Sequence, residues 1–526
     1  MIAVVVVVLA VSSGGPSSTQ RVAPVPLPHP GPGPESMFTP ASELNAADAD
    51  TLVSTLQQLG VESVHIYMHW GDIAPDPSSR VRPNFDATDP AAYPAAGWAE
   101  YDPLVQAISA HRMTVNLALV PPPPHWASGR GAPHPSTQPE WKPNAVDYGQ
   151  WVQAVATRYS GHYTPPGATQ PLPRVSFWSI YNEPNLGFQL APQAIDHSQV
   201  EVSARYYRAL VDSAWTALQT TGHGHDTILI GELGPAGETS GAGPGNFNSM
   251  APLRFLRALY CVDSAYRQLR GSAAAVRGCP TTAAASASFR ADNPGLFEAT
   301  GYADHPYSQG LPPDEATPNE PDFAELAAIG KLERVLDTLQ RVYGSNKQFP
   351  IWSTEFGYQT TPPDPEAGTV TPAEAAYYLN WSEYLTWVDP RQRSYDQYLL
   401  TDPTNGYFAT GLFTAAGAPK PGLYAYRMPL YLPYTATRLG HPLAVWGCVR
   451  PAPNAARSTH RTQTVKIELR AAGTAAYRTI ETVPLTGPHG YFDIPVRFPA
   501  SGEVRVAWTY PRGPEIFSRT VSVTLG

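Results

Sequence analysis

Charged residues are scarce in this sequence of 526 residues, and no stretch of it is strongly basic. Asp, Glu, Lys and Arg make up 15% of the chain, against roughly 25% in an average soluble domain. The formal net charge is −9. A surface that binds nucleic acid needs clustered Lys and Arg, so we expect no nucleic-acid partner.

Cysteine is also rare, with three residues in the whole chain. No Cys-x-x-Cys pair and no Cys/His group at metal-binding spacing occurs, so the sequence predicts no metal site. It implies no organic cofactor either. Cys261 and Cys279 lie in one segment, and an exported protein would permit a disulfide between them. Cys448 stands apart, and its role stays open.

The apolar run IAVVVVVLAV at residues 2–11 is too short to span a membrane. It is typical of the core of a secretory signal, although the usual positively charged start is missing. We therefore predict a signal peptide at residues 1–12, an extracellular protein and no stable membrane insertion. The alternative, an apolar strand of the mature fold, is disfavoured by the Pro/Gly/Ser-rich segment at residues 13–35.

Along residues 36–428, apolar strand-like runs alternate with helical patterns. Eight such units predict a (β/α)8 barrel, in which functional residues gather at the C-terminal ends of the strands. Residues 236–300 form a long insertion between the fifth and sixth strands. The expected strands are residues 36–40, 63–70, 113–123, 174–184, 226–235, 300–308, 349–360 and 394–402.

The pattern changes at residues 429–526, where short runs of alternating apolar and polar residues are separated by Gly and Pro turns. Such runs predict a small antiparallel β-sandwich. We find no catalytic constellation in it, so it either stabilises the barrel or binds glycan. The absence of an obvious Trp-rich face favours the first role.

Two glutamates end strands that are far apart in the sequence. Glu183 ends the fourth expected strand, in YNEPNLGF, and Glu355 ends the seventh, in WSTEFGY. A single glutamate at a strand end often only accepts hydrogen bonds from loop amides. In a closed barrel, however, both would face the same end. Glycoside cleavage needs such a pair, with one carboxylic acid to protonate the departing oxygen and one carboxylate to attack or stabilise the sugar.

These motifs resemble those of clan A glycoside hydrolases, whose two catalytic carboxylates lie on strands four and seven. Asn-Glu-Pro alone is moderately specific, but its combination with WSTEFG and with HPY at residues 305–307 is much more so. The NEPNL form most resembles family 39, followed by cellulase-like enzymes of family 5. The resemblance covers roughly residues 36–430.

The resemblance implies a role for each matching residue. Glu183 would be the general acid/base, with the higher pKa, and Glu355 the nucleophile. Asn182 would bind the sugar 2-hydroxyl, while Tyr307 and His305 would lie beside Glu355. Such enzymes retain the anomeric configuration, with carboxyl groups about 5–5.5 Å apart.

The sequence departs from the family pattern in two places. Many members have an Arg on strand two near the nucleophile, and here His65 is a weaker, pH-sensitive substitute. A platform Trp often ends strand eight, and here Tyr407 or Phe408 is the candidate.

Further candidates follow strands two and three. His69 and Trp70 are candidate substrate ligands, and Trp126 either stacks on a sugar or packs beneath the Pro-rich loop. Glu232 ends strand five and is either a polar substrate ligand or, as we expect, structural. We expect Asp304, just before His305, to cap or orient, and Trp352, inside strand seven, to lie in the core.

The sequence therefore predicts a secreted, retaining glycoside hydrolase that acts on a β-linked carbohydrate. A transglycosylase with the same residues and a non-catalytic carbohydrate-binding or cell-surface protein remain alternatives. The oligomeric state, the sugar, and endo or exo action stay open.

Overall fold

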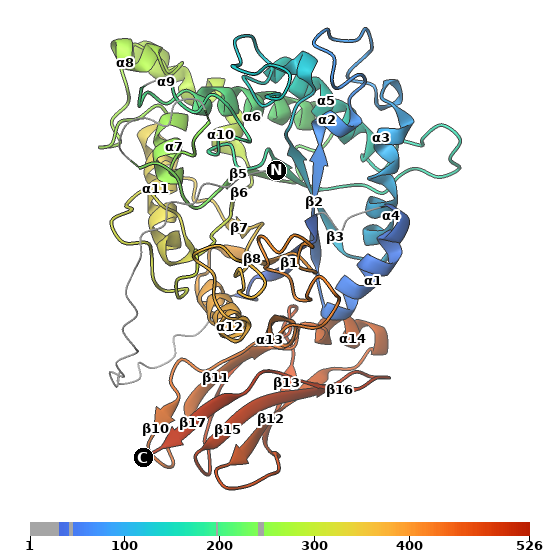
Figure 1. Ribbon diagram of the computed structural model, residues 1–526, viewed down its shortest axis with the longest axis vertical. Helices are drawn as coiled ribbons and strands as arrows, with labels where there is room; N and C mark the ends of the chain where they lie inside the picture. Colours follow the sequence, from blue (N-terminus) through green and yellow to red (C-terminus); the bar gives the residue numbers. More distant parts are fainter. Residues whose placement is uncertain (1–30, 42–45, 196–197, 240–246) are drawn as a thin grey trace.

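The computed structural model of the protein describes residues 31–41, 46–195, 198–239 and 247–526. Its larger part is a closed barrel of eight parallel strands in the order β1 to β8, surrounded by helices (Figure 1). The predicted (β/α)8 fold is thus confirmed. The barrel strands are β1 Glu35–Thr39, β2 Ser63–His69, β3 Thr114–Val120, β4 Phe177–Ile180, β5 Thr227–Leu233, β6 Gly301–Asp304, β7 Ile351–Ser353 and β8 Gln392–Tyr398.

The alternation of side chains along each strand explains the barrel. In β3, Val115, Leu117 and Leu119 belong to the main apolar core together with residues of the surrounding helices. Asn116 and Ala118 alternate with them and are fully buried, as expected for positions that face the barrel interior. The helices of this part are α1 Ala49–Leu59, α2 Trp70–Ile73, α3 Ala95–Ala99, α4 Asp102–Ala110, α5 Ala145–Arg158, α6 Ser203–Thr220, α7 Pro252–Leu259, α8 Gly271–Ala275, α9 Ala283–Asp292, α10 Pro294–Glu298, α11 Ile329–Val342, α12 Pro372–Val388 and α13 Pro421–Arg427.

Strands β4, β6 and β7 are shorter than the sequence suggested, with four, four and three residues. The apolar runs continue beyond them, but the chain leaves the barrel wall. Glu183 and Glu355 therefore lie in the segments that follow β4 and β7 and not on the strands themselves.

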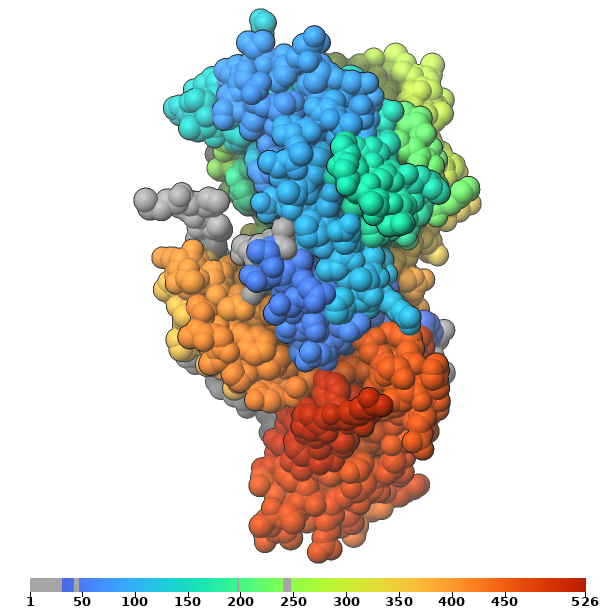
Figure 2. Space-filling view, turned by 90° about the vertical axis from the view of Figure 1, so that its right-hand side faces the viewer, coloured from blue at the N-terminus to red at the C-terminus, as the bar shows by residue number. Residues whose placement is uncertain are grey.

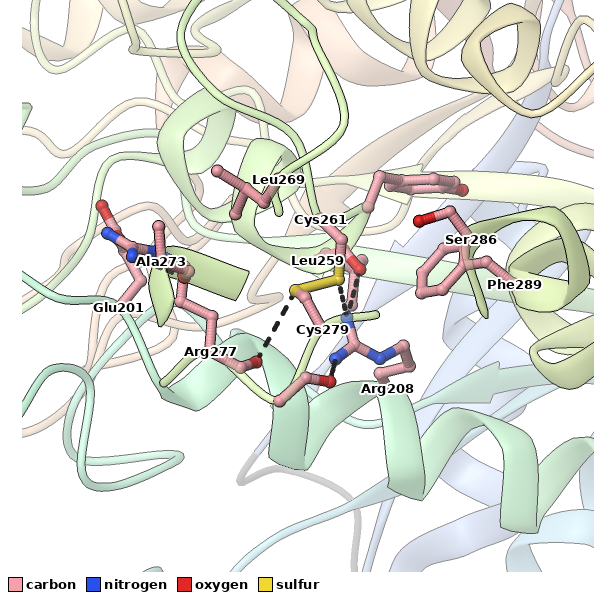
Figure 3. The surroundings of a disulfide bond; sticks show 12 residues. Glu201, Arg208, Leu259, Cys261, Leu269, Ala273, Arg277, Cys279, Ser286 and Phe289 are labelled. Atoms are coloured by element: carbon pink, nitrogen blue, oxygen red, sulfur yellow. Dashed lines mark hydrogen bonds and ion pairs between the residues drawn. A yellow bond between two sulfur atoms is a disulfide. The ribbon is translucent and has the colours of Figure 1, made fainter. Parts of the chain in front are cut away.

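The insertion after β5 folds into helices α7 to α10 and contains the predicted disulfide. Cys261 and Cys279 are bonded, with their Cα atoms 5.6 Å apart. Figure 3 shows Arg208 of α6 beneath this bond. Its guanidinium donates to the carbonyl oxygens of Leu259 and Gly278, at 2.6 and 2.8 Å. The disulfide and Arg208 together tie the insertion to the helical layer.

The C-terminal part consists of two β-sheets around a separate apolar core. One sheet has the order β14-β11-β9, and the other the order β10-β17-β15-β12-β13, with β16 added to β15. All its pairs are antiparallel except β10 with β17. The sandwich is confirmed, and it includes a helix that the sequence analysis did not predict. Its elements are β9 Leu430–Tyr431, β10 Ala436–Thr437, β11 Leu443–Cys448, α14 Ala452–Thr459, β12 Gln463–Ala471, β13 Arg478–Leu485, β14 Tyr491–Val496, β15 Gly502–Thr509, β16 Glu515–Phe517 and β17 Val521–Leu525.

The sandwich packs against the end of the barrel where the strands begin (Figures 1 and 2). Gly60, just before β2, has φ +86°, and a Cβ there would lie 2.3 Å from the Arg450 carbonyl. Only glycine tolerates this turn and this close approach together. A buried ion pair joins Arg450 to Glu383 of α12 at 2.7 Å. We call Glu383 and Arg450 the seam pair.

The predicted signal peptide at residues 1–12 and nearly all of the segment at residues 13–35 lie outside the described residues. Within the described part of the chain, the helices are all too short or too polar to cross a membrane.

Candidate active site

Asn182 and Glu183 follow β4 in a backbone that bends sharply. Tyr181 and Glu183 both have positive φ angles, 75° and 43°, which non-glycine residues adopt infrequently. The Glu183 amide donates to the carbonyl oxygen of Glu232 on β5 at 2.8 Å. This bond secures the turn, and the Glu183 side chain remains 15% exposed.

Glu355 follows β7 and is held by two phenols. Tyr67 of β2 donates to Glu355 Oε1, and Tyr307, in the segment after β6, donates to Oε2 at 2.9 Å. The Glu355 side chain is 8% exposed. One oxygen of Glu183 and one of Glu355 lie within 4.8 Å of each other. The two candidate carboxylates are therefore neighbours, although 171 residues of chain lie between them.

His305 is fully buried between three carboxylates. Its Nδ1 lies 3.1 Å from Glu183 Oε1 and 3.4 Å from Glu355 Oε1, and its Nε2 lies 2.7 Å from Glu232 Oε2. An ionised carboxylate only accepts hydrogen bonds, so both ring nitrogens are directed as donors. We call Glu183, Glu232, His305 and Glu355 the carboxylate cluster.

Burial and these contacts shift the pKa values of the cluster. Burial raises the pKa of Glu355 to about 7, against the attraction of His305 and the two phenols, and the negative charge of Glu183 adds to the rise. Burial opposes a charge on His305, but Glu355, Glu183 and Glu232 together raise its pKa well above 6.5. For Glu232, burial is outweighed by the hydrogen bond from His305 and by nearby imidazoles, which lower its pKa.

The expectation that Glu183 has the higher pKa stays a prediction. Burial raises the pKa of Glu355, whose side chain is the less exposed of the two.

Two predicted substrate ligands lie in the apolar core instead of at the site. Trp70 is 1% exposed and stacks on Trp151, with ring centroids 5.7 Å apart. Trp126 is 8% exposed and donates from its indole nitrogen to the Pro75 carbonyl. Trp70 begins α2 directly after β2, and Trp126 lies in the turn His125–Ala127 after β3, so protein contacts occupy both rings. We therefore withdraw both as substrate ligands.

Two histidines of β2 lie in different surroundings, and His69 stays a candidate substrate ligand. His69 is half-buried, with Nδ1 2.7 Å from the Pro121 carbonyl oxygen. His65 is fully buried, and burial lowers its pKa to about 4. A neutral imidazole cannot replace a guanidinium, so the cation beside Glu355 is His305 and not His65.

Asn182 and Phe408, two further candidates from the sequence, differ in their surroundings. Asn182 is 9% exposed, and its Oδ1 has no hydrogen-bond partner among the described residues. Phe408 lies edge-on to Tyr307 and to Tyr398, with centroids 5.4 and 5.5 Å apart. Tyr407 is 50% exposed and has no such contact with the described site residues.

A metal ion could in principle be held by Glu183, His305 and Glu355, whose ligand atoms all lie within 4.8 Å of one another. A histidine ligand must offer a lone pair from a neutral ring. Both His305 nitrogens point at carboxylate oxygens, so the residues fit a hydrogen-bonded cluster better than a metal centre.

Several site residues had no signal that identified them in the sequence. Tyr67 lies within an ordinary strand pattern, and Thr354, which donates to Glu232 at 2.7 Å, has no distinctive sequence feature besides its place before Glu355. Asp396 of β8 accepts from the Phe356 amide at 3.2 Å and fixes the segment that carries Glu355. Each lies on the inner side of the barrel, and this side could have been screened for polar residues.

No protein-family model matches the chain, and no curated protein is similar enough in sequence to match it. Solved structures do resemble it. One is a family 39 glycoside hydrolase from Bacteroides cellulosilyticus WH2, at 14% identity and a TM-score of 0.46, covering 89% of this chain and 80% of that one.

A glucosidase from Croceicoccus marinus has 11% identity and a TM-score of 0.44, covering 89% and 92% of the two chains. A family 5 glycoside hydrolase from Bacteroides vulgatus has 9% identity and a TM-score of 0.39, covering 93% and 89%. At these identities the likeness is one of architecture, and the chemistry has to be argued from the residues of the site.

Proposed function

We propose that the protein is a secreted glycoside hydrolase that cleaves β-linked glycosides with retention of configuration. The observation that carries the proposal is the pair of carboxylates, Glu183 and Glu355, with oxygens within 4.8 Å of each other. Retaining enzymes hold their two carboxyl groups about 5–5.5 Å apart, whereas inverting enzymes need about 6.5–9.5 Å to admit a water. The catalytic unit spans residues 36–428 and the sandwich residues 429–526.

In the first step, Glu355 attacks the anomeric carbon and Glu183 gives its proton to the departing glycosidic oxygen. Tyr67 and Tyr307 hold the attacking carboxylate by their hydroxyl groups. The glycosyl group is then bonded to Glu355. In the second step, Glu183 removes a proton from water, which attacks the same carbon and restores the Glu355 carboxylate.

Asn182 and Phe408 supply the sugar contacts of this proposal. Asn182, which directly precedes Glu183 and is 9% exposed, would hydrogen-bond the sugar 2-hydroxyl through its side-chain amide. Phe408 takes the place of the platform Trp and offers a ring to the apolar face of the sugar. His305 and Tyr307 orient the carboxylates.

The test is hydrolysis of aryl β-glycosides and a panel of plant, fungal and bacterial glycans by the purified protein. Glu355→Gln is expected to lose about 10⁴-fold or more in kcat, as nucleophile removal does in other hydrolases. Glu183→Gln is expected to lose about 10²- to 10⁴-fold on glycans. It should lose much less on aryl glycosides, whose leaving groups need no protonation.

Azide separates the two roles. With Glu355→Ala, azide would attack in place of the carboxylate and give a glycosyl azide of inverted configuration, whereas Glu183→Ala would give the retained product. Glu201→Gln, in an ion pair with Arg254 and Arg277 outside the site, is the matched control. Parental rates in both site variants would refute the proposal. Sugar transfer without hydrolysis would indicate a transglycosylase, and glycan binding without turnover would indicate a binding protein.

A further inference from the structure

Glu232 owes its position to an irregularity in strand β5. The strand pairs with β6 through Gly231↔Ala303 and then Leu233↔Asp304, so Glu232 is an extra residue in the register. With regular alternation it would share the outward face with Ile228 and Ile230, which belong to the core beneath the helices. The bulge turns its carboxylate toward His305 instead.

The backbone at this bulge is one that few sequences tolerate. Gly231 has φ +110°, and a Cβ there would lie 2.5 Å from the Ala303 carbonyl oxygen. Glu232 itself has φ +51°, which is unfavourable for a residue with a side chain. Bulges of this kind recur next to active sites, where they redirect a side chain.

The redirected carboxylate is completely buried and is bound at one oxygen. Glu232 Oε2 accepts from His305 Nε2 at 2.7 Å and from Thr354 Oγ1 at 2.7 Å. Its side chain is 0% exposed, so it cannot touch a substrate. A buried carboxylate is unfavourable unless it is paired, and the partner here is the imidazole that faces Glu183 and Glu355.

We infer that Glu232 is a positioning residue: the β5 bulge delivers it to His305, which it holds as a fixed imidazolium facing both Glu183 and Glu355. This inference rests on the proposed function for its effect on catalysis. Glu232 thereby supplies, through His305, the positive charge that a guanidinium would otherwise provide. Without Glu232, the ring has no carboxylate at Nε2, and its doubly protonated form keeps only the two carboxylates at Nδ1, Glu183 and Glu355.

Other titratable groups surround this pair on every side. They come from β2, β6, β7 and β8 and the segments that follow them, and they include one neutral imidazole, further carboxyl groups and phenols. The groups are His65, Tyr67, Asp304, Tyr307, Glu355 and Asp396. Among these described groups there is no Lys or Arg, so His305 is their cation.

The test is Glu232→Gln, which keeps the shape and an acceptor oxygen but removes the charge. We expect kcat/KM on an aryl β-glycoside to fall about 10- to 100-fold, as when a supporting carboxylate of a site is lost, with KM nearly unchanged. The alkaline limb of the pH profile should move to lower pH, because His305 would lose its proton earlier.

A second readout does not depend on any substrate. In ¹⁵N-histidine NMR of the parent, His305 should carry protons on both ring nitrogens at pH 7.5, and in Glu232→Gln it should lose its second proton at a lower pH than in the parent. Glu383→Gln, which removes a buried carboxylate at the seam, is the control and should leave both the NMR signal and the pH profile unchanged.

Two results would overturn the inference. One is an unchanged His305 signal in Glu232→Gln, and the other is an activity loss that only follows the unfolded fraction with an unshifted pH profile. If the parent hydrolyses no glycoside while the NMR result is as expected, the positioning role stands and the proposed function fails.

Discussion

The carboxylate cluster and the seam pair both bury glutamates, but they balance charge differently. At the seam, one carboxylate meets one guanidinium, with side-chain exposures of 1% for Glu383 and 2% for Arg450. Tyr491 donates to the other Glu383 oxygen at 2.8 Å, and Arg450 donates to the Tyr426 carbonyl at 2.8 Å. Both charged groups of the seam pair therefore have hydrogen-bond partners besides each other.

In the carboxylate cluster, three carboxylates share one imidazole. Repulsion and burial leave Glu355 with a pKa near 7, so the cluster keeps a proton that it can exchange near neutral pH. The comparison teaches that burial alone does not mark a functional glutamate. An excess of carboxylates over cations is the better indication of a functional glutamate, because such a site can exchange a proton near neutral pH.

Among variants that test the contrast between the seam pair and the carboxylate cluster, Arg450→Met is expected to change stability most. It leaves Glu383 buried without a cation, and breaking such a pair typically lowers the free energy of unfolding by about 3–5 kcal/mol. Urea unfolding measures this loss. Activity per folded molecule should equal that of the parent, since the seam lies at the opposite end of the barrel from the site.

The double variant Arg450→Met/Glu383→Leu is the control, because replacing both partners should restore most of the stability. A fall in kcat at temperatures where Arg450→Met is fully folded would contradict the separation of the two regions.

Glu355→Gln is expected to raise the free energy of unfolding at alkaline pH, by less than Arg450→Met lowers it. The pKa of Glu355 is raised by burial from 4.5 to about 7, so its contribution to stability is present below pH 4.5 and is lost as the pH rises through 7. Glutamine does not ionise. The variant should therefore be more stable than the parent by about 1–3 kcal/mol at pH 8 and equal to it at pH 4.

Thermal or urea unfolding across this pH range measures the difference. If Glu355→Gln were less stable than the parent at pH 8, the ionised carboxylate would be favourably placed, and the cluster would resemble the seam after all.

The smallest effect is expected from His489→Gln, at the edge of the seam. His489 Nδ1 lies 2.8 Å from Glu62 Oε2, with side-chain exposures of 19% and 22%. Burial opposes the charge, but Glu62 raises the pKa of His489. Its stabilisation is full below pH 6.5 and is lost as the pH rises through the raised pKa.

The variant should therefore be less stable than the parent by at most about 1 kcal/mol at pH 6, with no difference at pH 9. Comparison of urea midpoints at the two pH values measures this. An equal difference at both pH values would show that the contact acts by packing and not by charge.

Much of the fold could be predicted because it follows from local patterns. The alternation of apolar strands with amphipathic helices gave all eight barrel units, and the alternating runs after residue 429 gave the sandwich. The disulfide was found because its two cysteines share one segment. What failed was local detail: the lengths of β4 and β7, and the ring of Trp70, which tertiary packing placed in the core. For Trp126 the structure favours the packing alternative.

The site was predictable only in part. Glu183, Glu355, Asn182, His305 and Tyr307 were found through motifs, and the structure brings them together. Glu232 is expected from the sequence to be structural, with a substrate ligand as the alternative. Its place beside His305 could not be predicted, because no sequence pattern indicates the β5 bulge. The raised pKa of Glu355 could not be predicted from the sequence, because it depends on burial and on neighbours from several parts of the barrel.

The sequence by itself determined the architecture and the two carboxylates, because side-chain periodicity and strand-end motifs are local properties. Only the tertiary structure decided which groups share a proton. Proton sharing depends on side-chain contacts of about 3 Å between residues carried by β2, β4, β5, β6 and β7 and the segments that follow them. It also depends on a single extra residue in β5 that turns Glu232 toward His305.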